Sequence, residues 1–421
     1  MCYSKTKNNG SSAKKEAKKI NSTNTTTIIM RKKTFAFVTF LLPAFLFAQE
    51  YKKIHENAIV ADTHNDVLST VTMAGLDFEN NLLGKSQSDI ARFKEGGVDV
   101  QVFSIFCDER FGKDTAFKYA NIEIDSLYAI VKRNPDKLMI VSTPKELFTA
   151  VKEKKLACMM GVEGGHMIED DLNKLDSLFK RGVRYMTLTW NNSTSWASSA
   201  KDEAGNTVPN PKKGLNDFGK QIVKRMNELG MMVDISHVGE QTFWDAINTT
   251  TKPVIASHSS VYAICPVPRN LKDDQIKAVA KNGGVIDVNF FSGFIDSNYF
   301  KKREVFFSRH KAEYDSLNAL KKPEYEVSGY MSAKYPQEIN AIRPPLSLLI
   351  DHIDYIVKLV GVDYVGLGSD FDGIDSAPIG LEGVQDFPKI TEALLQRGYS
   401  KKDIEKILGG NFLRVFKANS K

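Results

Sequence analysis

The sequence is poor in cysteine, and this shortage excludes a small scaffold held together by disulfides. The spacing of its four cysteines matches no zinc-binding motif, and Cys158 lies inside an apolar run, where we expect it to be part of the core. One disulfide remains compatible with the sequence if the protein is exported. The cysteines are Cys2, Cys107, Cys158 and Cys265.

Motifs of several common catalytic classes are also missing. The sequence contains no GxSxG nucleophile elbow, no P-loop, no HExxH zinc motif and no GxGxxG after the first expected strand. These absences argue against a serine hydrolase of the α/β-hydrolase type, a P-loop nucleotide-binding protein and a dinucleotide-dependent enzyme.

The main part of the chain lacks a strong net charge of either sign. The formal charge of the 421 residues is +6, but residues 1–33 hold nine Lys and Arg residues and one acid, Glu16. The remainder therefore carries 48 basic and 50 acidic residues, a net charge of −2. This balance does not fit a polyanion-binding surface, so we expect no nucleic-acid partner.

One apolar run near the N-terminus has the pattern of a targeting segment. Residues 34–48 are apolar, follow three basic residues and end at the small residue Ala48, as in a secretory signal peptide. We expect translation to start at Met30, residues 1–48 to be an N-terminal extension and signal peptide, and the protein to be exported to the periplasm or the extracellular space. The run is shorter than the roughly 20 residues of a membrane span, so no stable span is expected in the mature chain. An uncleaved membrane anchor is the alternative.

From residue 49 onward, apolar runs alternate with amphipathic stretches. Continuous apolar runs are typical of parallel strands that are buried on both faces, and eight is the number that closes a barrel. We therefore predict an α/β fold in which residues 49–421 form a single TIM-like (β/α)8 barrel domain. The expected strands are 57–62, 99–106, 156–162, 183–189, 230–236, 253–257, 284–290 and 363–369.

Residues 291–345 interrupt this rhythm between the seventh and eighth expected strands. The segment is long, charged and aromatic, and its composition predicts a helical insertion. Loops at this position build the rim of a barrel active site, so a lid or a partner surface is one interpretation. A helical outgrowth without a catalytic role is the other. Outside the insertion, we expect helices to begin at the capping residues Ser86, Asp170 and Asn216.

Metal-binding side chains follow the first and third of these strands. His64 and Asp66 are two residues apart, a spacing that points two side chains of a strand the same way and lets both reach one ion. Glu163 follows the third strand and precedes two glycines, which allow close backbone approach. One carboxylate can bridge two ions through its two oxygens.

Two histidines end neighbouring strands further along the chain. His237 closes DISH and His258 closes ASH, and together they would supply imidazoles to a second ion, a ligand type that suits zinc. His166 stands in the same loop as Glu163, and the preceding glycines favour turning it away from the site. A surface or core role is the alternative for each of these histidines.

Asp370 and Arg269 are the candidates for proton transfer and substrate binding. Asp370 in GSDFDG is nearest to the end of the eighth strand, where a carboxylate can take a proton from an attacking water and pass it to a leaving amine. We interpret Asp372 as a structural turn residue. Arg269 lies shortly after the His258 strand and could bind a substrate carboxylate with two hydrogen bonds; a structural salt bridge is the alternative.

In order along the chain, these motifs resemble the membrane (renal) dipeptidase family of zinc peptidases. The matching segments are DTHND, GVEGGH, a TLT run at 187–189, DISHVG, ASHSS, PRN, GSDFDG and a closing NFLRVF, which together span roughly residues 55–418. Each motif alone is modest, whereas the ordered set is highly specific.

The resemblance implies a TIM-like barrel with two zinc ions and a dipeptide as substrate. By match, His64 and Asp66 bind one ion, His237 and His258 bind the other, and Glu163 bridges them. Asp370 matches the acid/base residue, and Arg269 matches the group that holds the substrate carboxylate. Many members of the family are dimers, so a homodimer is expected. The sequence departs from the family at Trp190, where a histidine that contacts the substrate is common.

We therefore predict a zinc dipeptidase in which a hydroxide shared by both ions attacks the peptide bond. A second hypothesis keeps the two zinc ions but assigns another small amide, such as an N-acyl amino acid or a β-lactam, because Trp190 and the insertion could change the substrate. An indole donates one hydrogen bond but cannot accept a proton. A third hypothesis, from another class, is a metal-loaded binding protein without catalysis.

Overall fold

The computed structural model describes residues 49–209, 212–322 and 324–421. Every strand and helix named below lies in one compact unit, Tyr51–Lys421. The expected signal peptide falls outside the described residues, so export stays a prediction. In the described part of the chain, no helix is both long enough and apolar enough to cross a membrane.

Eight parallel strands form a nearly closed barrel, as the alternating pattern predicts. Each strand pairs in parallel with the next, and the ends meet where the Asp370 amide donates to the His64 carbonyl (3.0 Å) and the Asp66 amide to the Phe371 carbonyl (2.9 Å). The predicted (β/α)8 barrel is therefore confirmed. Its strands are β1 (Ala61–Asn65), β2 (Val100–Ile105), β4 (Leu156–Val162), β5 (Val183–Thr187), β6 (Met232–Asp234), β7 (Ile255–Ala256), β8 (Val285–Asn289) and β9 (Val365–Gly368).

The first predicted strand is displaced, and a ninth strand was missed. Residues 51–57 are helical, and β1 covers 61–65 rather than 57–62. The prediction followed apolar side chains, whereas β1 itself is the largely polar segment ADTHN. The extra strand β3 (Leu138–Ile140) pairs with the first half of β4, and its three residues are too few to give a distinct apolar run.

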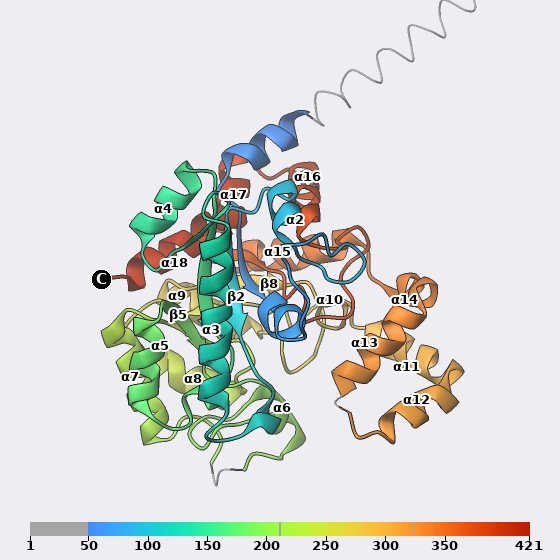
Figure 1. Ribbon diagram of the computed structural model, residues 1–421, viewed down its shortest axis with the longest axis horizontal. Coiled ribbons are helices and arrows are strands. Elements are labelled where there is room, and N and C mark those ends of the chain that lie inside the picture. Colours follow the sequence, from blue (N-terminus) through green and yellow to red (C-terminus); the bar gives the residue numbers. More distant parts are fainter. Residues whose placement is uncertain (1–48, 210–211, 323) are drawn as a thin grey trace, which may run out of the picture. The chain divides into compact units, whose positions relative to one another are not determined.

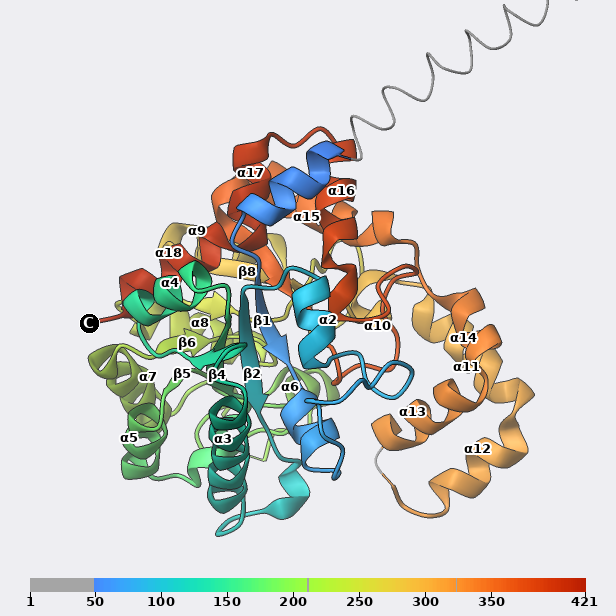
Figure 2. The same cartoon turned by 45° about the horizontal axis from the view of Figure 1, so that its top comes forward.

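Helices surround the strands on the outside (Figures 1 and 2). The predicted N-cap Asn216 is confirmed, because its side chain accepts from the Gly219 amide, but two other caps were wrong. Asp89 rather than Ser86, and Asp171 rather than Asp170, accept the capping bonds. The helices are α2 (Ile90–Glu95), α3 (Ala116–Arg133), α4 (Pro144–Lys152), α5 (Leu172–Lys180), α6 (Ala200–Gly205), α7 (Asp217–Leu229), α8 (Glu240–Thr249), α9 (Asp273–Asn282), α15 (Leu346–Val360), α16 (Phe387–Gln396), α17 (Lys401–Glu405) and α18 (Asn411–Asn419).

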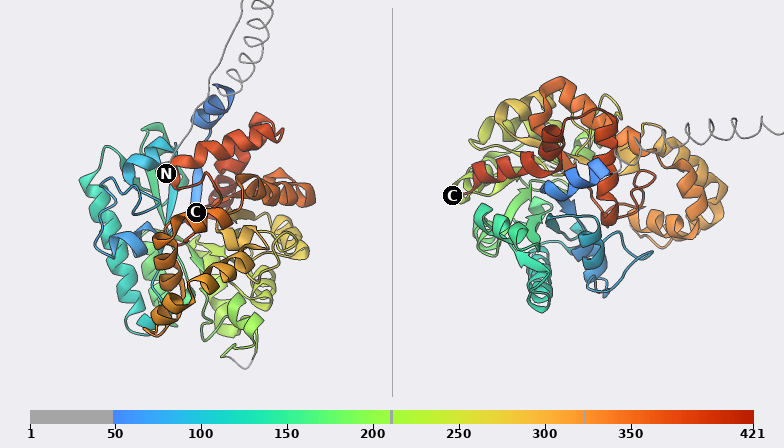
Figure 3. Two further views of the ribbon diagram at one scale, coloured as in Figure 1. Left: turned by 90° about the vertical axis from the view of Figure 1, so that its right-hand side faces the viewer. Right: turned by 90° about the horizontal axis from the view of Figure 1, so that it is seen from above.

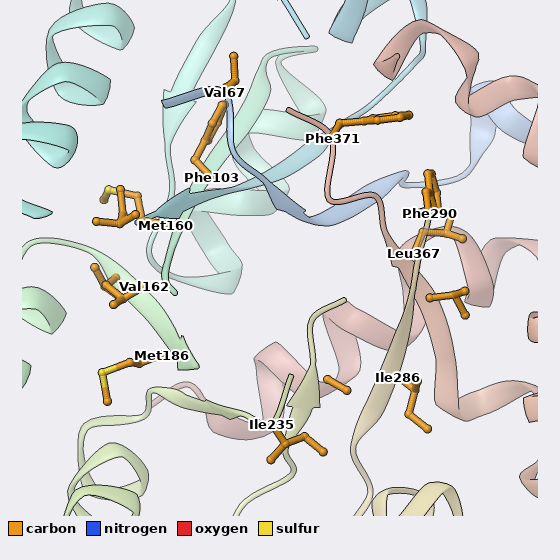
Figure 4. Packing of buried hydrophobic residues seen from close by; sticks show 14 of the residues in the cluster. Val67, Phe103, Met160, Val162, Met186, Ile235, Ile286, Phe290, Leu367 and Phe371 are labelled. Carbon is orange, nitrogen blue, oxygen red and sulfur yellow. The ribbon is translucent and has the colours of Figure 1, made fainter. Parts of the chain in front are cut away.

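Alternate side chains of the strands belong to two separate apolar clusters. One cluster joins outward side chains such as Met160 and Met186 to the surrounding helices (Figure 4). The other fills the barrel and includes Val102, Met159 and Phe416, the last from α18. Because α18 contributes to this inner cluster and contacts β6, β8 and β9, it closes the amino-terminal end of the barrel. Three cysteines of the described residues are buried as free thiols: Cys107, Cys158 and Cys265.

The predicted insertion between the seventh and eighth barrel strands is helical and projects to one side of the barrel (Figure 3). It has a small apolar centre of its own, formed by Phe306, Met331 and Ile339. Arg110, after β2, pairs with Glu326 of the insertion at 3.3 Å. The helices that follow β8 are α10 (Ser292–Ile295), α11 (Tyr299–Arg309), α12 (Lys311–Asn318), α13 (Glu324–Lys334) and α14 (Pro336–Ile342).

Candidate metal centre

The side chains predicted as metal ligands converge at the carboxyl end of the barrel. Each sits in or directly after a strand, which is where parallel barrels place their functional groups. They come from strands far apart in sequence and are buried, with at most 8% of any of them exposed. The five residues are His64 in β1, Asp66 after β1, Glu163 after β4, His237 after β6 and His258 after β7.

Glu163 lies at the centre of this group, and its two oxygens face different partners. Oε2 is 3.3 Å from Nε2 of His64 and accepts a hydrogen bond from the Ser104 hydroxyl at 3.1 Å. Oε1 is 2.9 Å from Nε2 of His237 and 3.6 Å from Nε2 of His258. The Glu163 carboxylate therefore lies between the His64 imidazole on one side and the imidazoles of His237 and His258 on the other.

The tautomer of His64 is set by Tyr185 from inside the barrel. The Tyr185 hydroxyl donates to the Thr63 carbonyl at 2.9 Å, so it accepts from Nδ1–H of His64, also at 2.9 Å. Nε2 of His64 then carries a lone pair. This atom is 3.5 Å from Asp66 Oδ2. A metal-binding histidine is oriented in this way by a hydrogen bond at its other nitrogen.

The other two imidazoles are oriented by the same principle. Ser257 donates its hydroxyl proton to Asp234 Oδ2 at 2.6 Å and accepts from Nδ1–H of His258 at 2.8 Å. His237 donates from Nδ1 to the Asn191 side-chain oxygen at 3.1 Å. The two Nε2 atoms are left with lone pairs and lie 2.9 Å apart, facing Glu163.

Two of the candidate residues have left-handed backbone conformations. His237 has a φ of 63° and Asp370 a φ of 61°, which non-glycine residues rarely adopt and which cluster at functional sites. Gly373 follows this second turn. A Cβ atom there would lie 2.3 Å from Asp66 Oδ2 and 2.8 Å from Asp370 Oδ1, so only glycine lets the turn approach both carboxylates.

Asp370 is held beside the cluster by Asn289 of β8. The Asn289 amide donates to Asp370 Oδ2 at 2.8 Å, which fixes the carboxylate and leaves Oδ1 for another partner. Burial raises the pKa of Asp370 well above its ordinary value, and the neighbouring Asp66 and Glu163 carboxylates raise it further. Asp372 accepts from Ser86 and the Gln87 amide, which agrees with the structural role predicted for it.

The donor set fits a bound cation. His64 Nε2 and Asp66 Oδ1 are buried and have no hydrogen-bond partner within the described residues. Ligand atoms of His64, Glu163 and His258 lie within 4.8 Å of one another, as do those of His64, Asp66 and Asp370. Imidazoles with free lone pairs and carboxylates at such distances repel one another unless a positive charge lies between them, and zinc takes both ligand types.

Arg269 lies at the edge of the centre. Its guanidinium donates to the His258 carbonyl at 3.5 Å and rests over the Phe294 ring at 5.3 Å from the centroid. Its Nε atom is buried without a hydrogen-bond partner. Burial lowers the pKa of Arg269 to about 10, which leaves it a cation at neutral pH, while Asp370 and Glu163 favour the charged form.

Trp190 and His166 both lie close to Gly164, the residue after Glu163. The Trp190 ring packs against Phe106, with centroids 4.8 Å apart. The His166 ring folds back against Gly164, where a Cβ atom would be 2.5 Å from its Nδ1, and its Nε2 bonds to the Cys107 carbonyl at 2.8 Å. These contacts bind His166 to the backbone of neighbouring loops, and its distance from the metal ligands stays a prediction.

Sequence reasoning missed the residues that orient the ligands. They carry no motif of their own, because a serine, asparagine or tyrosine at a strand end has no pattern that separates it from core or surface positions. The alternation of side chains along a strand is the one signal that could have found some of them, because every second residue points to the same face of the sheet as a ligand on that strand. They are Ser104, Tyr185, Asn191, Asp234, Ser257 and Asn289.

A parallel barrel with imidazoles and carboxylates clustered at its carboxyl end defines the class of metal-dependent barrel hydrolases. The sequence profile of the family described as membrane dipeptidase (peptidase family M19) matches residues 48–421. The chain belongs to this family of metallo-dipeptidases.

Individual relatives agree with this assignment. An uncharacterized dipeptidase of Schizosaccharomyces pombe is 33% identical over 391 residues, which cover 88% of this chain and 83% of the relative. The crystal structure of the probable dipeptidase PvdM from Pseudomonas aeruginosa is 26% identical, covers 89% of this chain and 98% of its own, and has a TM-score of 0.73.

A more distant solved structure shares the fold. It is a metallo peptidase from Rhodobacter sphaeroides, liganded with a phosphinate mimic of the dipeptide L-Ala-D-Ala. It is 21% identical, covers 86% of this chain and 100% of its own, and has a TM-score of 0.68.

Proposed function

We propose that the protein hydrolyses the peptide bond of dipeptides with two zinc ions bound at the carboxyl end of its barrel. In this proposal His64 and Asp66 hold one ion, His237 and His258 hold the other, and Glu163 bridges them. The observation that carries the assignment is the division of the Glu163 oxygens, of which Oε2 faces His64 and Oε1 faces His237 and His258.

The ions would supply Lewis acidity, which makes water nucleophilic at neutral pH and polarises a peptide carbonyl. The chain's own residues would do the rest. Asp370, oriented by Asn289, would take the proton of the attacking water and deliver it to the leaving amine. A raised pKa suits this role, because the carboxyl group then holds the proton long enough to donate it.

Arg269 would hold the carboxylate of the substrate. Its guanidinium is a fixed cation at the rim of the centre and has two nitrogens in the planar arrangement that binds carboxylates. Trp190 would contact the substrate beside Glu163, through its aromatic face rather than as a proton acceptor. The dipeptide mimic bound to the Rhodobacter sphaeroides neighbour supports a substrate of this size and class.

The first test is amino-acid release from a panel of L-L and L-D dipeptides by the zinc-loaded protein from Gln49 onward. We expect release that disappears with a chelator and returns with zinc. The panel should include an N-acyl amino acid and a β-lactam. Cleavage of these alone would favour the other amide, and no cleavage by a folded, metal-loaded protein would favour a binding role.

Asp370→Asn tests the proton-transfer assignment separately from metal binding. The variant keeps the shape of the side chain and an acceptor for Asn289, but it cannot carry the proton. We expect kcat to fall by about a hundredfold to ten-thousandfold, the usual contribution of general acid–base catalysis. Zinc content, measured by elemental analysis, should stay at two ions per chain, and full activity would refute the role.

Export and assembly form the rest of the proposal. The basic and apolar N-terminal pattern supports secretion to the periplasm or the extracellular space, with cleavage after Ala48. N-terminal sequencing of the protein recovered from the cell envelope would identify the first mature residue. A homodimer is expected from the family resemblance, and light scattering of the purified protein would measure it.

A further inference from the structure

A cavity of about 240 Å³ adjoins the metal centre on the side of Arg269. Its lining residues come from α6, the first turn of α8 and the segment that follows β7. Figure 1 labels both helices. The apolar side chains of its lining include Ala200 and Ala204 of α6, Ile235, and Phe243 of α8. An engineered protein cavity of about 150 Å³ holds benzene, so this space is large enough for an aromatic or long aliphatic group.

Two residues belong to both the cavity and the metal centre. His237, which faces Glu163, and Arg269 are part of the cavity lining. If Arg269 holds the carboxylate of a dipeptide, the α-carbon of the C-terminal residue is one bond of about 1.5 Å from that carboxylate. The side chain on this α-carbon then starts next to the wall that the cavity shares with Arg269.

We propose that this cavity is the subsite for the side chain of the substrate's C-terminal residue. It accepts side chains up to the size of phenylalanine, and it favours an anionic end group over a cationic one. This inference rests on the proposed dipeptidase function, and it names the class of dipeptide that the enzyme prefers: those with a long, apolar or acidic C-terminal side chain.

The charges around the cavity support the preference for an anion. Lys272 is neutralised by Glu240, since their charged atoms are 2.7 Å apart. Lys213 donates to the Glu203 carbonyl at 2.9 Å and to the Asn206 side-chain oxygen at 3.3 Å, and no carboxylate of the described residues pairs with it.

Glu203 is the remaining acid of the lining, and its carboxylate is occupied by neutral donors. It accepts from the Ser198 hydroxyl and from the Gln241 amide. Once Arg269 holds the α-carboxylate and Lys272 is paired with Glu240, Lys213 is the cation of the lining that has only neutral acceptors. A carboxylate at the tip of the substrate side chain would be attracted, and an ammonium group would be repelled.

The test compares kcat/KM for Ala-X dipeptides with X as Gly, Leu, Phe, Glu and Lys, in both stereochemical forms of X. We expect Leu, Phe and Glu to exceed Gly, and Glu to exceed Lys. Lys213→Glu should lower the Glu-to-Lys preference by about two- to fivefold, the range of an exposed charge pair. An unchanged ratio would overturn the charge preference.

Ala204→Phe tests the size of the subsite. Ala204 is exposed, so its replacement leaves the barrel core intact while it fills the cavity. We expect the Phe-to-Gly ratio of kcat/KM to fall by tenfold or more, because pockets discriminate by about ten- to two-hundredfold per methylene. The matched control is Ala418→Phe, an exposed helical position on α18 at the other end of the barrel, which should change neither the ratio nor the activity.

The outcomes separate this inference from the proposed function. Cleavage of Ala-Gly with no preference among the side chains, or an equal effect of Ala204→Phe on all substrates, would overturn the subsite and leave the dipeptidase function standing. No cleavage of any dipeptide by the zinc-loaded wild type would overturn the function itself.

Discussion

The two ends of the barrel interior are built from opposite kinds of residue. At the amino-terminal end, Val102, Met159 and Phe416 pack into the inner apolar cluster. At the carboxyl end, Glu163 and His64 face each other among buried polar atoms, several of which have no hydrogen-bond partner within the described residues. The amino-terminal end is arranged as a stable core. The carboxyl end places repelling groups together, an arrangement that stability alone would not favour.

This difference shows how one fold separates stability from function. The strained backbone of His237 and Asp370 and the crowding of carboxylates belong to the carboxyl end alone. Their free-energy cost must be offset elsewhere, and α18 with the inner apolar cluster is the region available to do it. Changes at one end should therefore alter metal binding and turnover, and changes at the other should alter the free energy of unfolding.

Glu163→Gln should have the largest effect on function. The variant keeps the size of the side chain but loses the charge that would bridge two ions, so we expect kcat/KM to fall by roughly a thousandfold, equivalent to several kcal/mol of metal-derived stabilisation. Zinc content should fall below two ions per chain. The free energy of unfolding of the zinc-loaded variant, from urea titration, should fall with the lost ion, because an ion that binds the folded state stabilises it. Lower stability with normal zinc content would contradict the comparison.

Phe416→Ala makes the reciprocal change at the amino-terminal end. Phe416 is fully buried and stacks on Phe412 with ring centroids 6.1 Å apart. We expect the free energy of unfolding to fall by about 3–5 kcal/mol, as for other buried aromatic truncations. At a temperature where the variant remains folded, kcat/KM and zinc affinity should match the wild type. A loss of activity in the folded variant would show that the two ends are coupled.

Gly373→Ala sharpens the comparison within the site. The added Cβ atom must displace Asp66 or Asp370, and a misplacement of about 1 Å in an active site can reduce turnover by about a hundredfold. The matched control is Gly329→Ala in α13, where a Cβ atom would have no neighbour within 4 Å. We expect the control to keep full activity. Equal effects of the two changes on kcat/KM would refute the steric argument.

Ser257→Ala should have the smallest effect on function, because the Ser257 hydroxyl orients the proposed metal ligand His258 and does not itself bind the ion. Without the Ser257 hydroxyl, Nδ1 of His258 loses its acceptor and Asp234 loses a donor. We expect zinc affinity, measured by competition with a chromophoric chelator, to fall by about ten- to a hundredfold. Ser126→Ala on α3, whose hydroxyl bonds only to a local carbonyl, is the control. No change in zinc affinity would mean that barrel packing alone orients His258.

The sequence predicted the barrel well where its strands are apolar and poorly where they are polar. β4 lies where it was predicted, because its seven residues, LACMMGV, form one continuous apolar run that is buried along its whole length. β1 was misplaced because its five residues, ADTHN, are largely polar. This polar strand carries His64, so the apolar pattern fails at the candidate site itself.

The sequence by itself determined the fold class and the set of chemical groups, because strand alternation and the order of His, Asp and Glu at strand ends are local patterns. Only the tertiary structure decided which groups meet. Closing the barrel brings Glu163 to His237 across 74 residues of chain, and it puts Tyr185 behind His64 and Ser257 behind His258. The cavity beside Arg269 was equally invisible in the sequence, because its walls come from α6, α8 and the segment after β7, which are separate in the chain. Contacts of this kind follow from strand order and register, which depend on the packing of the whole chain.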